Sequence, residues 1–178
     1  MIRIPTLTTD RLILRAFRDD DLDAYAAMCA DPEVMRYIGD GKTLSRAETW
    51  RLIAFYTGHW QLRGFGLWAL EERASGRFIG EAGLQQPEGW PGFELGWTLG
   101  RAWWGQGYAT EAAREALRYA FEELDHDHVI SLIHPDNRPS IRLAERLGER
   151  LEDETEFMGG RTLVYGIHRA KWTRSTST

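Results

Sequence analysis

The chain of 178 residues is long enough for one domain with a sizeable hydrophobic core and too short to suit two. A hydrophobic fraction of 43% and eight tryptophans are typical of a globular protein. The formal net charge of −5 argues against nucleic-acid binding, which depends on clustered Lys and Arg that neutralise phosphates. Because no apolar run approaches the length of a membrane span and the N-terminus lacks the apolar core of a signal peptide, we expect a cytoplasmic protein without a membrane partner.

The first third of the chain predicts one strand followed by helices. Asp19-Asp20-Asp21 places acidic residues at a helix N-terminus, and Ser45 and Glu48 have the spacing of a capping box. Cys29, the single cysteine, lies on the apolar face of the first helix and is expected in the core, which excludes an internal disulfide. The predicted elements are a strand over 11–17, helices that begin near 19 and 31, and a helix that begins at 45 and ends at Gly64.

The remainder of the chain alternates strands and helices. This order predicts a single mixed α/β domain, with a mostly antiparallel central sheet flanked by helices and one strand–helix–strand crossover. We assign residues 7–170 to the domain and 171–178 to a C-terminal tail that is disordered at its end. The predicted elements are strands over 66–71, 77–85 and 93–99, a helix over 108–124, a strand over 128–134, a helix over 139–147, and a hairpin of strands over 151–157 and 161–168.

A glycine-bearing turn between a predicted strand and a predicted helix is the most informative feature of the sequence. Gly105 and Gly107 allow the chain to turn tightly and allow an anion to approach the backbone. The unpaired N–H groups and the positive end of the helix dipole together favour a pyrophosphate. A dinucleotide fingerprint would need Gly or Ala at Thr110 and an acidic residue in place of His134, so that alternative is poorly matched.

Three sequence blocks in register resemble one family. The run Trp104-Gly105-Gln106-Gly107-Tyr108-Ala109-Thr110-Glu111-Ala112 is similar to the acetyl-CoA loop of the GNAT superfamily, and more narrowly to the branch of ribosomal-protein N-terminal acetyltransferases RimJ and RimL. Thr9 to Arg15 resembles the opening strand of that branch, and Pro135 to Gly148 resembles its late cofactor-contacting turn and helix. The similarity extends from about Leu7 to His168, so it implies the GNAT fold for the whole domain.

The resemblance also implies roles for the matching positions in binding acetyl-CoA. Backbone groups of Trp97, Thr98 and Leu99 are expected to pair with the pantetheine arm like an added strand. The Asn137 side chain is expected near the pantetheine, although a helix N-cap before Pro139 explains it equally well on local grounds. Backbone N–H groups are expected to hold the pyrophosphate at Trp104, Gly105, Gln106, Gly107, Tyr108, Ala109 and Thr110.

The sequence departs from the family at two positions. Ala102 stands where many members carry Gln or Arg, so the phosphate loop must depend mostly on its backbone, unless Arg101 substitutes. Ala144 stands where many members carry the tyrosine that protonates the departing thiolate. The acid must therefore come from elsewhere, and we choose Ser140, for which a first-turn serine that satisfies backbone groups is the alternative.

A neutral amine is needed for attack on the thioester, so a general base is expected. Glu94 is the first candidate, because the resemblance implies a strand on which some GNAT enzymes carry a glutamate base, and an outward-facing strand residue is the alternative for it. Glu81 is the second candidate. His134 is the third candidate because histidine titrates in the useful range. Direct transfer is expected, because Cys29 is a poor nucleophile candidate. The run Asp125-His126-Asp127-His128 lacks the rest of a ligand set and reads as a solvated turn, so no metal is expected.

The combined prediction is an N-acetyltransferase that moves acetyl from acetyl-CoA directly to a primary amine. The acceptor is a protein or peptide N-terminus or a small-molecule amine, in a groove walled by residues 28–60 and 152–162, with Tyr37, Trp50, Trp90 and Trp103 as aromatic candidates. Two alternatives remain: a non-catalytic acyl-CoA-binding module, and a nucleotide-binding domain that prefers NAD or ATP. The chain is expected to be a monomer or a homodimer.

Overall fold

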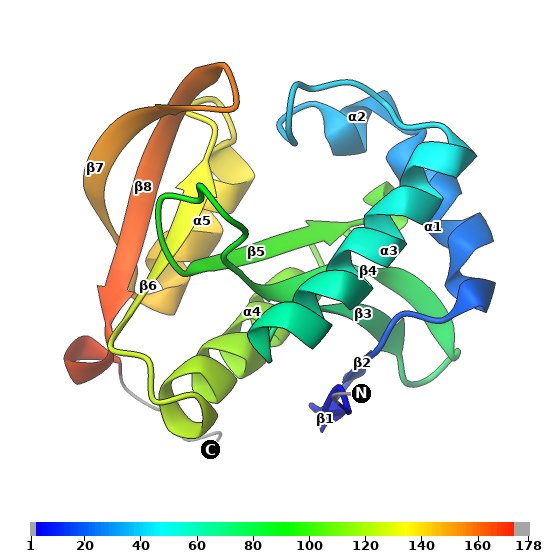
Figure 1. The fold of residues 1–178 in the computed structure, drawn as a ribbon, viewed down its shortest axis with the longest axis horizontal. Helices are drawn as coiled ribbons and strands as arrows, with labels where there is room; N and C mark the ends of the chain where they lie inside the picture. Colours follow the sequence, from blue (N-terminus) through cyan, green and yellow to red (C-terminus); the bar gives the residue numbers. More distant parts are fainter. Residues whose placement is uncertain (1–2, 173–178) are drawn as a thin grey trace.

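An eight-stranded sheet in the order β1-β2-β3-β4-β5-β6-β8-β7 forms the centre of the computed structural model, which describes residues 3–172 (Figure 1). Every neighbouring pair is antiparallel except β5 and β6, which are parallel. The strands are β1 (Leu7–Thr8), β2 (Leu12–Arg15), β3 (Leu67–Glu72), β4 (Arg77–Gln85), β5 (Glu94–Leu99), β6 (His128–Ile133), β7 (Arg150–Phe157) and β8 (Gly160–His168), and the α-helices are α1 (Leu22–Cys29), α2 (Pro32–Met35), α3 (Arg46–Arg63), α4 (Tyr108–Arg118) and α5 (Arg138–Leu147).

Helices cover both faces of the sheet. Consecutive strand residues point to opposite faces, and on β3 Leu67 packs with the α1–α3 side chains whereas Trp68 packs in the cluster that holds the buried alanines of α4. Ala112, Ala113 and Ala116 are fully buried, which lets α4 approach the strands closely. This mixed α/β fold with a mostly antiparallel sheet confirms the fold class predicted from the sequence.

Local sequence signals account for most element ends. Ser45 accepts a hydrogen bond from the Glu48 N–H while Glu48 accepts one from the Ser45 N–H, so the predicted capping box is confirmed, and Gly64 ends α3 with a φ of 79°. Two predictions need correction. The short strand β1 precedes the predicted first strand, and the predicted helix over 108–124 is an α-helix only to Arg118, followed by a π-helical turn over Tyr119–Glu123.

The parallel pair opens into a cleft because β5 and β6 part soon after they meet. Glu94 and Ile130 are their one register pair, and the Ile130 N–H donates to the Phe93 carbonyl. Figure 1 shows the β7–β8 hairpin and the α1–α2 segment on opposite sides of β5. The glycine turn lies between the C-terminal end of β5, which lines the cleft, and the start of α4.

Among residues 3–172, no helix combines the length and apolar character needed to cross a bilayer. Lys171 closes a short 3-10 turn and Trp172 packs against Phe121 with ring centroids 5.5 Å apart, so the first two residues of the predicted tail contact the domain. The disorder predicted for the end of the tail falls outside the described residues.

Candidate active site

The cleft between β5 and β6 has a volume of about 760 Å³. Segments from the whole chain line it: the loop after α2, the buried faces of β4 and β5, the end of β6, the start of α5 and the tip of the β7–β8 hairpin. Its polar lining includes Glu81, Glu94, His134, Asn137 and Ser140. All three base candidates, the acid candidate and the late asparagine therefore line one cavity.

The glycine turn at the end of β5 presents unpaired backbone donors. Gly105 and Gly107 have φ values of 73° and 84°, in the left-handed region that favours glycine, and Gly107 is the N-cap of α4. No acceptor within residues 3–172 pairs with the backbone N–H groups of 105–110. The N-terminus of α4 adds its dipole to these donors, so the turn suits a pyrophosphate as predicted.

An interaction that sequence reasoning missed holds this turn in place. Glu111 on α4 accepts hydrogen bonds from the Thr9 hydroxyl at 2.6 Å and from the Arg11 N–H at 2.8 Å. The Arg11 guanidinium binds Glu111 at 2.7 Å and donates to the Gln106 carbonyl at 2.8 Å. It also lies over the Tyr108 ring, 4.4 Å from the centroid. The first sequence block is therefore hydrogen-bonded to the glycine turn and restricts its conformation.

Of the three residues expected to pair with the pantetheine through their backbone, Thr98 needs correction, because its backbone faces β4 and not the free edge of β5. The Gly100 N–H donates to the Ile79 carbonyl and the Ile130 N–H to the Phe93 carbonyl. By the alternation of antiparallel pairs, Trp97 and Leu99 turn their backbone toward β6 while Thr98 turns its own toward β4. The Leu99 carbonyl accepts from the Trp104 indole N–H at 2.8 Å. The Trp97 N–H and carbonyl therefore face the cleft, and Thr98 lines it.

The start of α5 brings Asn137 and Ser140 to the opposite wall. Asn137 is the N-cap, and its side-chain oxygen accepts from the Ser140 N–H at 3.2 Å, which leaves its amide N–H groups for another acceptor. The Ser140 hydroxyl oxygen accepts from the Trp97 indole N–H at 3.3 Å. This contact crosses the cleft from β5 to α5 and leaves the hydroxyl proton available.

Two buried carboxyl groups face the cleft. Glu94 accepts from the Gln85 amide at 2.8 Å and from the Trp90 indole, so it is not the outward-facing strand residue considered as the alternative. Glu81 accepts from the hydroxyls of Tyr25 and Tyr56. Burial raises the pKa of each carboxyl to about 7, against the opposing effect of these hydrogen bonds. Both groups are therefore poised to exchange protons near neutral pH.

The remaining candidates are constrained by their neighbours. His134 stacks against Tyr37 at 5.0 Å between centroids, and its Nδ1 accepts from the Asp136 N–H at 3.1 Å. Because Nδ1 accepts this bond, the neutral ring has its N–H at Nε2, and no unpaired ring nitrogen faces an acceptor amine. Arg101, the cation considered as a substitute at the glycine turn, pairs with Asp31 at 3.1 Å.

Aromatic residues line part of the region that is expected to bind the acceptor. Tyr37 and Trp90 line the cleft as predicted, and Trp90 contacts Phe157 of the hairpin with centroids 4.7 Å apart. Trp50 is 53% exposed and Trp103 lines a separate cleft of about 450 Å³ beside α1, so these two are not part of the main cleft.

A third buried carboxyl group lies behind the cleft and was not anticipated. Glu149 is fully buried directly after the Gly148 cap of α5, and its Oε1 lies 3.1 Å from the Ser131 hydroxyl, which donates to the Leu95 carbonyl at 2.9 Å. Its Oε2 has no partner among the described residues. Burial raises its pKa to about 8, with smaller contributions from the charges of Glu152 and Glu94. No local signal distinguishes this glutamate from its exposed neighbours.

The fold and the cleft define a transferase that uses acyl-CoA as its donor. The pattern of the acetyltransferase (GNAT) domain matches residues 11–150, and the chain belongs to this family of acetyl-CoA-dependent N-acetyltransferases. The predicted family is therefore confirmed.

Curated relatives and solved structures agree with this assignment. The protein YkkB of Bacillus subtilis is 36% identical over 150 residues, which cover 80% of this chain and 83% of YkkB. The FsC-acetyl coenzyme A-N(2)-transacetylase of Aspergillus fumigatus is 34% identical over 139 residues, which cover 71% of this chain and 57% of that protein.

Among solved structures, an acetyltransferase from Agrobacterium tumefaciens has a TM-score of 0.84 at 33% identity, over 94% of this chain and 96% of its own. The structure of RimL, the ribosomal L7/L12 alpha-N-protein acetyltransferase in complex with coenzyme A, has a TM-score of 0.78 at 17% identity, over 92% of this chain and 98% of its own. The predicted ribosomal-protein branch is thus represented among the neighbours, and at this identity the likeness shows the shared fold.

Proposed function

We propose that this chain transfers the acetyl group of acetyl-CoA directly to a primary amine in the cleft between β5 and β6. The observation that carries the proposal is one cavity lined by the free edge of β5 and by buried carboxyl groups with a raised pKa, together with a turn of unpaired backbone donors that follows the same strand. The turn suits the pyrophosphate of an acyl-CoA, and the strand edge suits its pantetheine arm. The carboxyl groups suit removal of a proton from an amine.

Glu94 is the proposed general base. Acetyl-CoA supplies a thioester carbonyl as the electrophile, and an ammonium cannot attack it. Glu94 accepts the proton of the bound ammonium through its carboxylate, and its pKa of about 7 is matched to neutral pH and to an amine with a pKa near 8. Glu81, 5% exposed and similarly shifted, is the second candidate.

Trp97 and Ser140 are proposed to stabilise the two negative charges that develop during transfer, one on the carbonyl oxygen and one on the departing sulfur. The Trp97 backbone N–H stabilises the negative charge on the carbonyl oxygen as the C–N bond forms. As the C–S bond breaks, the Ser140 hydroxyl donates its proton to the sulfur, and the proton lost by the attacking nitrogen restores the hydroxyl through solvent. The products are an amide and coenzyme A. Cys29 takes no part, because it is buried and burial raises its pKa to about 12.

The lining of the cleft supports an amine carried on a partly apolar group. Four aromatic residues line the same cleft as the two carboxylates: Tyr37, Phe55, Trp90 and Phe157. The rings bind the apolar part of the acceptor, and its cationic end lies beside Glu81 and Glu94. Both a small-molecule amine and the N-terminal residue of a peptide fit this description. We place the reaction in the cytoplasm.

The test is an acceptor screen that measures coenzyme A release with a thiol reagent and product by mass spectrometry. Peptide α-amines, polyamines, amino acids and amine antibiotics form the panel. The buried Cys29 gives a low background with thiol reagents. Acetylation of at least one amine class supports the proposal, whereas acetyl-CoA binding without transfer to any class favours a non-catalytic module.

A matched pair of variants then tests the base. Glu94→Gln removes the carboxylate and is expected to lower kcat by about 10²-fold or more, with unchanged affinity for acetyl-CoA. Glu123→Gln changes an exposed glutamate outside the cleft in the same way and serves as the control. Equal kcat values for the two variants would remove Glu94 from the mechanism.

A further inference from the structure

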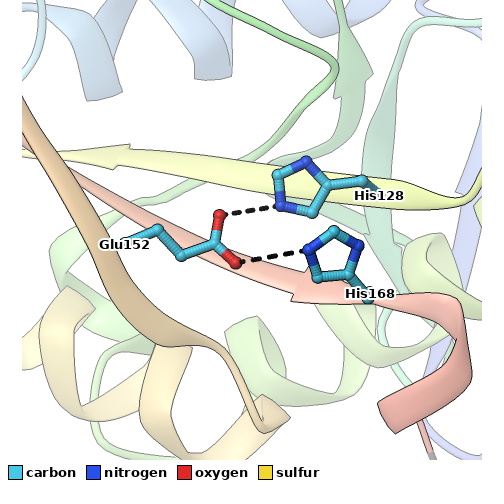
Figure 2. A group of neighbouring side chains, drawn as sticks. All are labelled: His128, Glu152 and His168. Atoms are coloured by element: carbon cyan, nitrogen blue, oxygen red, sulfur yellow. Dashed lines mark hydrogen bonds and ion pairs between the residues drawn. The ribbon is translucent and has the colours of Figure 1, made fainter.

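Three potential metal ligands meet on the surface of the sheet at the end of β6 remote from the cleft. His128 at the start of β6 and His168 at the end of β8 are direct cross-strand partners. Their imidazoles stack with centroids 4.2 Å apart and an interplanar angle of 21°. Figure 2 shows both rings presenting a nitrogen to the carboxylate of Glu152 on β7.

The separations between the nitrogen and oxygen atoms of these side chains are close to those between the ligand atoms of a metal site. His128 Nε2 lies 2.8 Å from one Glu152 oxygen, and His168 Nε2 lies 3.9 Å from the other. One ligand atom from each of the three side chains lies within 4.8 Å of the other two. In a tetrahedral zinc site with bonds near 2.1 Å, ligand atoms are about 3.4 Å apart. Small side-chain rotations are therefore enough to place all three around one ion.

The backbone is arranged so that Glu152 reaches the two histidines. Glu152 is the extra residue of a β-bulge, since Leu151 pairs with Tyr165 and Asp153 already pairs with Val164. A bulge re-aims a side chain, and this one sends the carboxylate across Gly166. A Cβ atom at Gly166 would lie only 2.2 Å from a Glu152 oxygen. The bulge and the glycine together make room for the carboxylate on the face that carries both rings.

Charge and access also suit a cation. The side chains of His128, Glu152 and His168 are 35%, 31% and 55% exposed, so an ion can enter from solvent. The neighbouring cation Arg169 is already paired with Asp125 and Asp127. The four residues of the Asp-His-Asp-His run thus have separate partners. Its two aspartates pair with Arg169, and His126 stacks on Phe93. His128 alone lies beside Glu152 and His168.

We propose that His128, Glu152 and His168 bind a divalent transition-metal cation, with Zn²⁺ as the best match. Two imidazoles and one carboxylate are a zinc ligand set, and the hard cations Mg²⁺ and Ca²⁺ prefer oxygen ligands throughout. Water completes the coordination. The ion links β7, whose neighbour in the described sheet is β8, to β6 across the base of the hairpin whose tip lines the cleft. Its predicted effect is on the stability of the fold.

The experiment is a zinc titration of the full chain, free of any histidine tag and treated with a chelator, against a chromophoric competitor at pH 7.5. We expect one Zn²⁺ per chain and no displacement by Mg²⁺. Glu152→Gln and His168→Gln are each expected to weaken binding by more than about tenfold, while Glu156→Gln on the same strand leaves it unchanged. Gly166→Ala, which displaces the carboxylate without changing a ligand, is expected to weaken binding similarly.

A second readout separates loss of the site from loss of the fold. Circular dichroism with chelator present checks that each variant is folded, and added Zn²⁺ is expected to raise the Tm of the natural protein and of Glu156→Gln only. No stoichiometric binding by the natural protein would overturn the proposal. Binding that survives Glu152→Gln, His168→Gln and Gly166→Ala would overturn it equally, since the ion would then lie elsewhere.

Discussion

Replacing Glu149 by Gln is expected to change how the stability of the fold depends on pH. Glu149 is fully buried with one oxygen unpartnered among the described residues, and burial raises its pKa from 4.5 to about 8. Below the unfolded pKa, both states hold the proton and its contribution to stability is fully present. As the pH rises toward the folded pKa, the native state retains a proton that the unfolded chain has lost, so stability falls.

The size of the effect follows from the same pKa values. Each pH unit in this window lowers the free energy of unfolding by about 1.4 kcal/mol for one such group. Ionisation of the native carboxyl near pH 8 reduces the slope, which leaves roughly 2 kcal/mol between pH 6 and pH 8. A glutamine has no such proton, so Glu149→Gln is expected to gain roughly 2 kcal/mol relative to the natural protein over this interval.

The assay is urea unfolding at pH 6 and pH 8, followed by tryptophan fluorescence, for the natural protein and Glu149→Gln. The difference between the two proteins isolates Glu149, because the other buried carboxyl groups, Glu81 and Glu94, are present in both. Glu156→Gln, an exposed change, controls for the loss of one carboxylate and should show no pH-dependent difference. The reasoning is refuted if Glu149→Gln and the natural protein keep the same stability difference at both pH values.

Three further predictions concern the active site. Because burial raises the pKa of Glu94 to about 7 and the base must be ionised, kcat/KM should rise as the pH increases through 7. Glu94→Gln should remove this rise, and an unchanged pH profile in the variant would contradict the role of Glu94 as base. Ser140→Ala should lower kcat about tenfold without changing acetyl-CoA affinity measured by calorimetry, and full activity would exclude Ser140 as the acid. Gly107→Ala and Gly76→Ala both place a side chain at positive φ and should lose about 1–2 kcal/mol of stability in unfolding experiments. Only Gly107→Ala should weaken acetyl-CoA binding, and equal binding by the two variants would argue against the glycine turn as the phosphate site.

Signals that act between near neighbours in the chain were readable from the sequence. The capping pair Ser45 and Glu48 and the terminating Gly64 fix α3 through bonds that span at most four residues. The turn at Gly105 and Gly107 was readable for the same reason, because its geometry depends on its own backbone. The π-helical turn after Arg118 escaped prediction, since a single i→i+5 turn at the end of a helix is too short to change the apolar pattern of the segment.

Burial and long-range pairing were not readable in this way. Glu94 was named by family resemblance, but its raised pKa depends on side chains brought together by the sheet. The Arg11–Glu111 pair joins residues 100 positions apart. In the Asp-His-Asp-His run the sequence drew attention to His128 but suggested no partner, because Glu152 and His168 approach it only through β-sheet register.

Calorimetric titration with acetyl-CoA tests the central claim most directly, with NAD and ATP as control ligands and Gly107→Trp as the variant that fills the phosphate turn. The account predicts one acetyl-CoA bound per chain by the natural protein, no binding of NAD or ATP, and loss of acetyl-CoA binding in a folded Gly107→Trp. Failure of the folded natural protein to bind acetyl-CoA, or undiminished binding by Gly107→Trp, would contradict the assignment of this cleft.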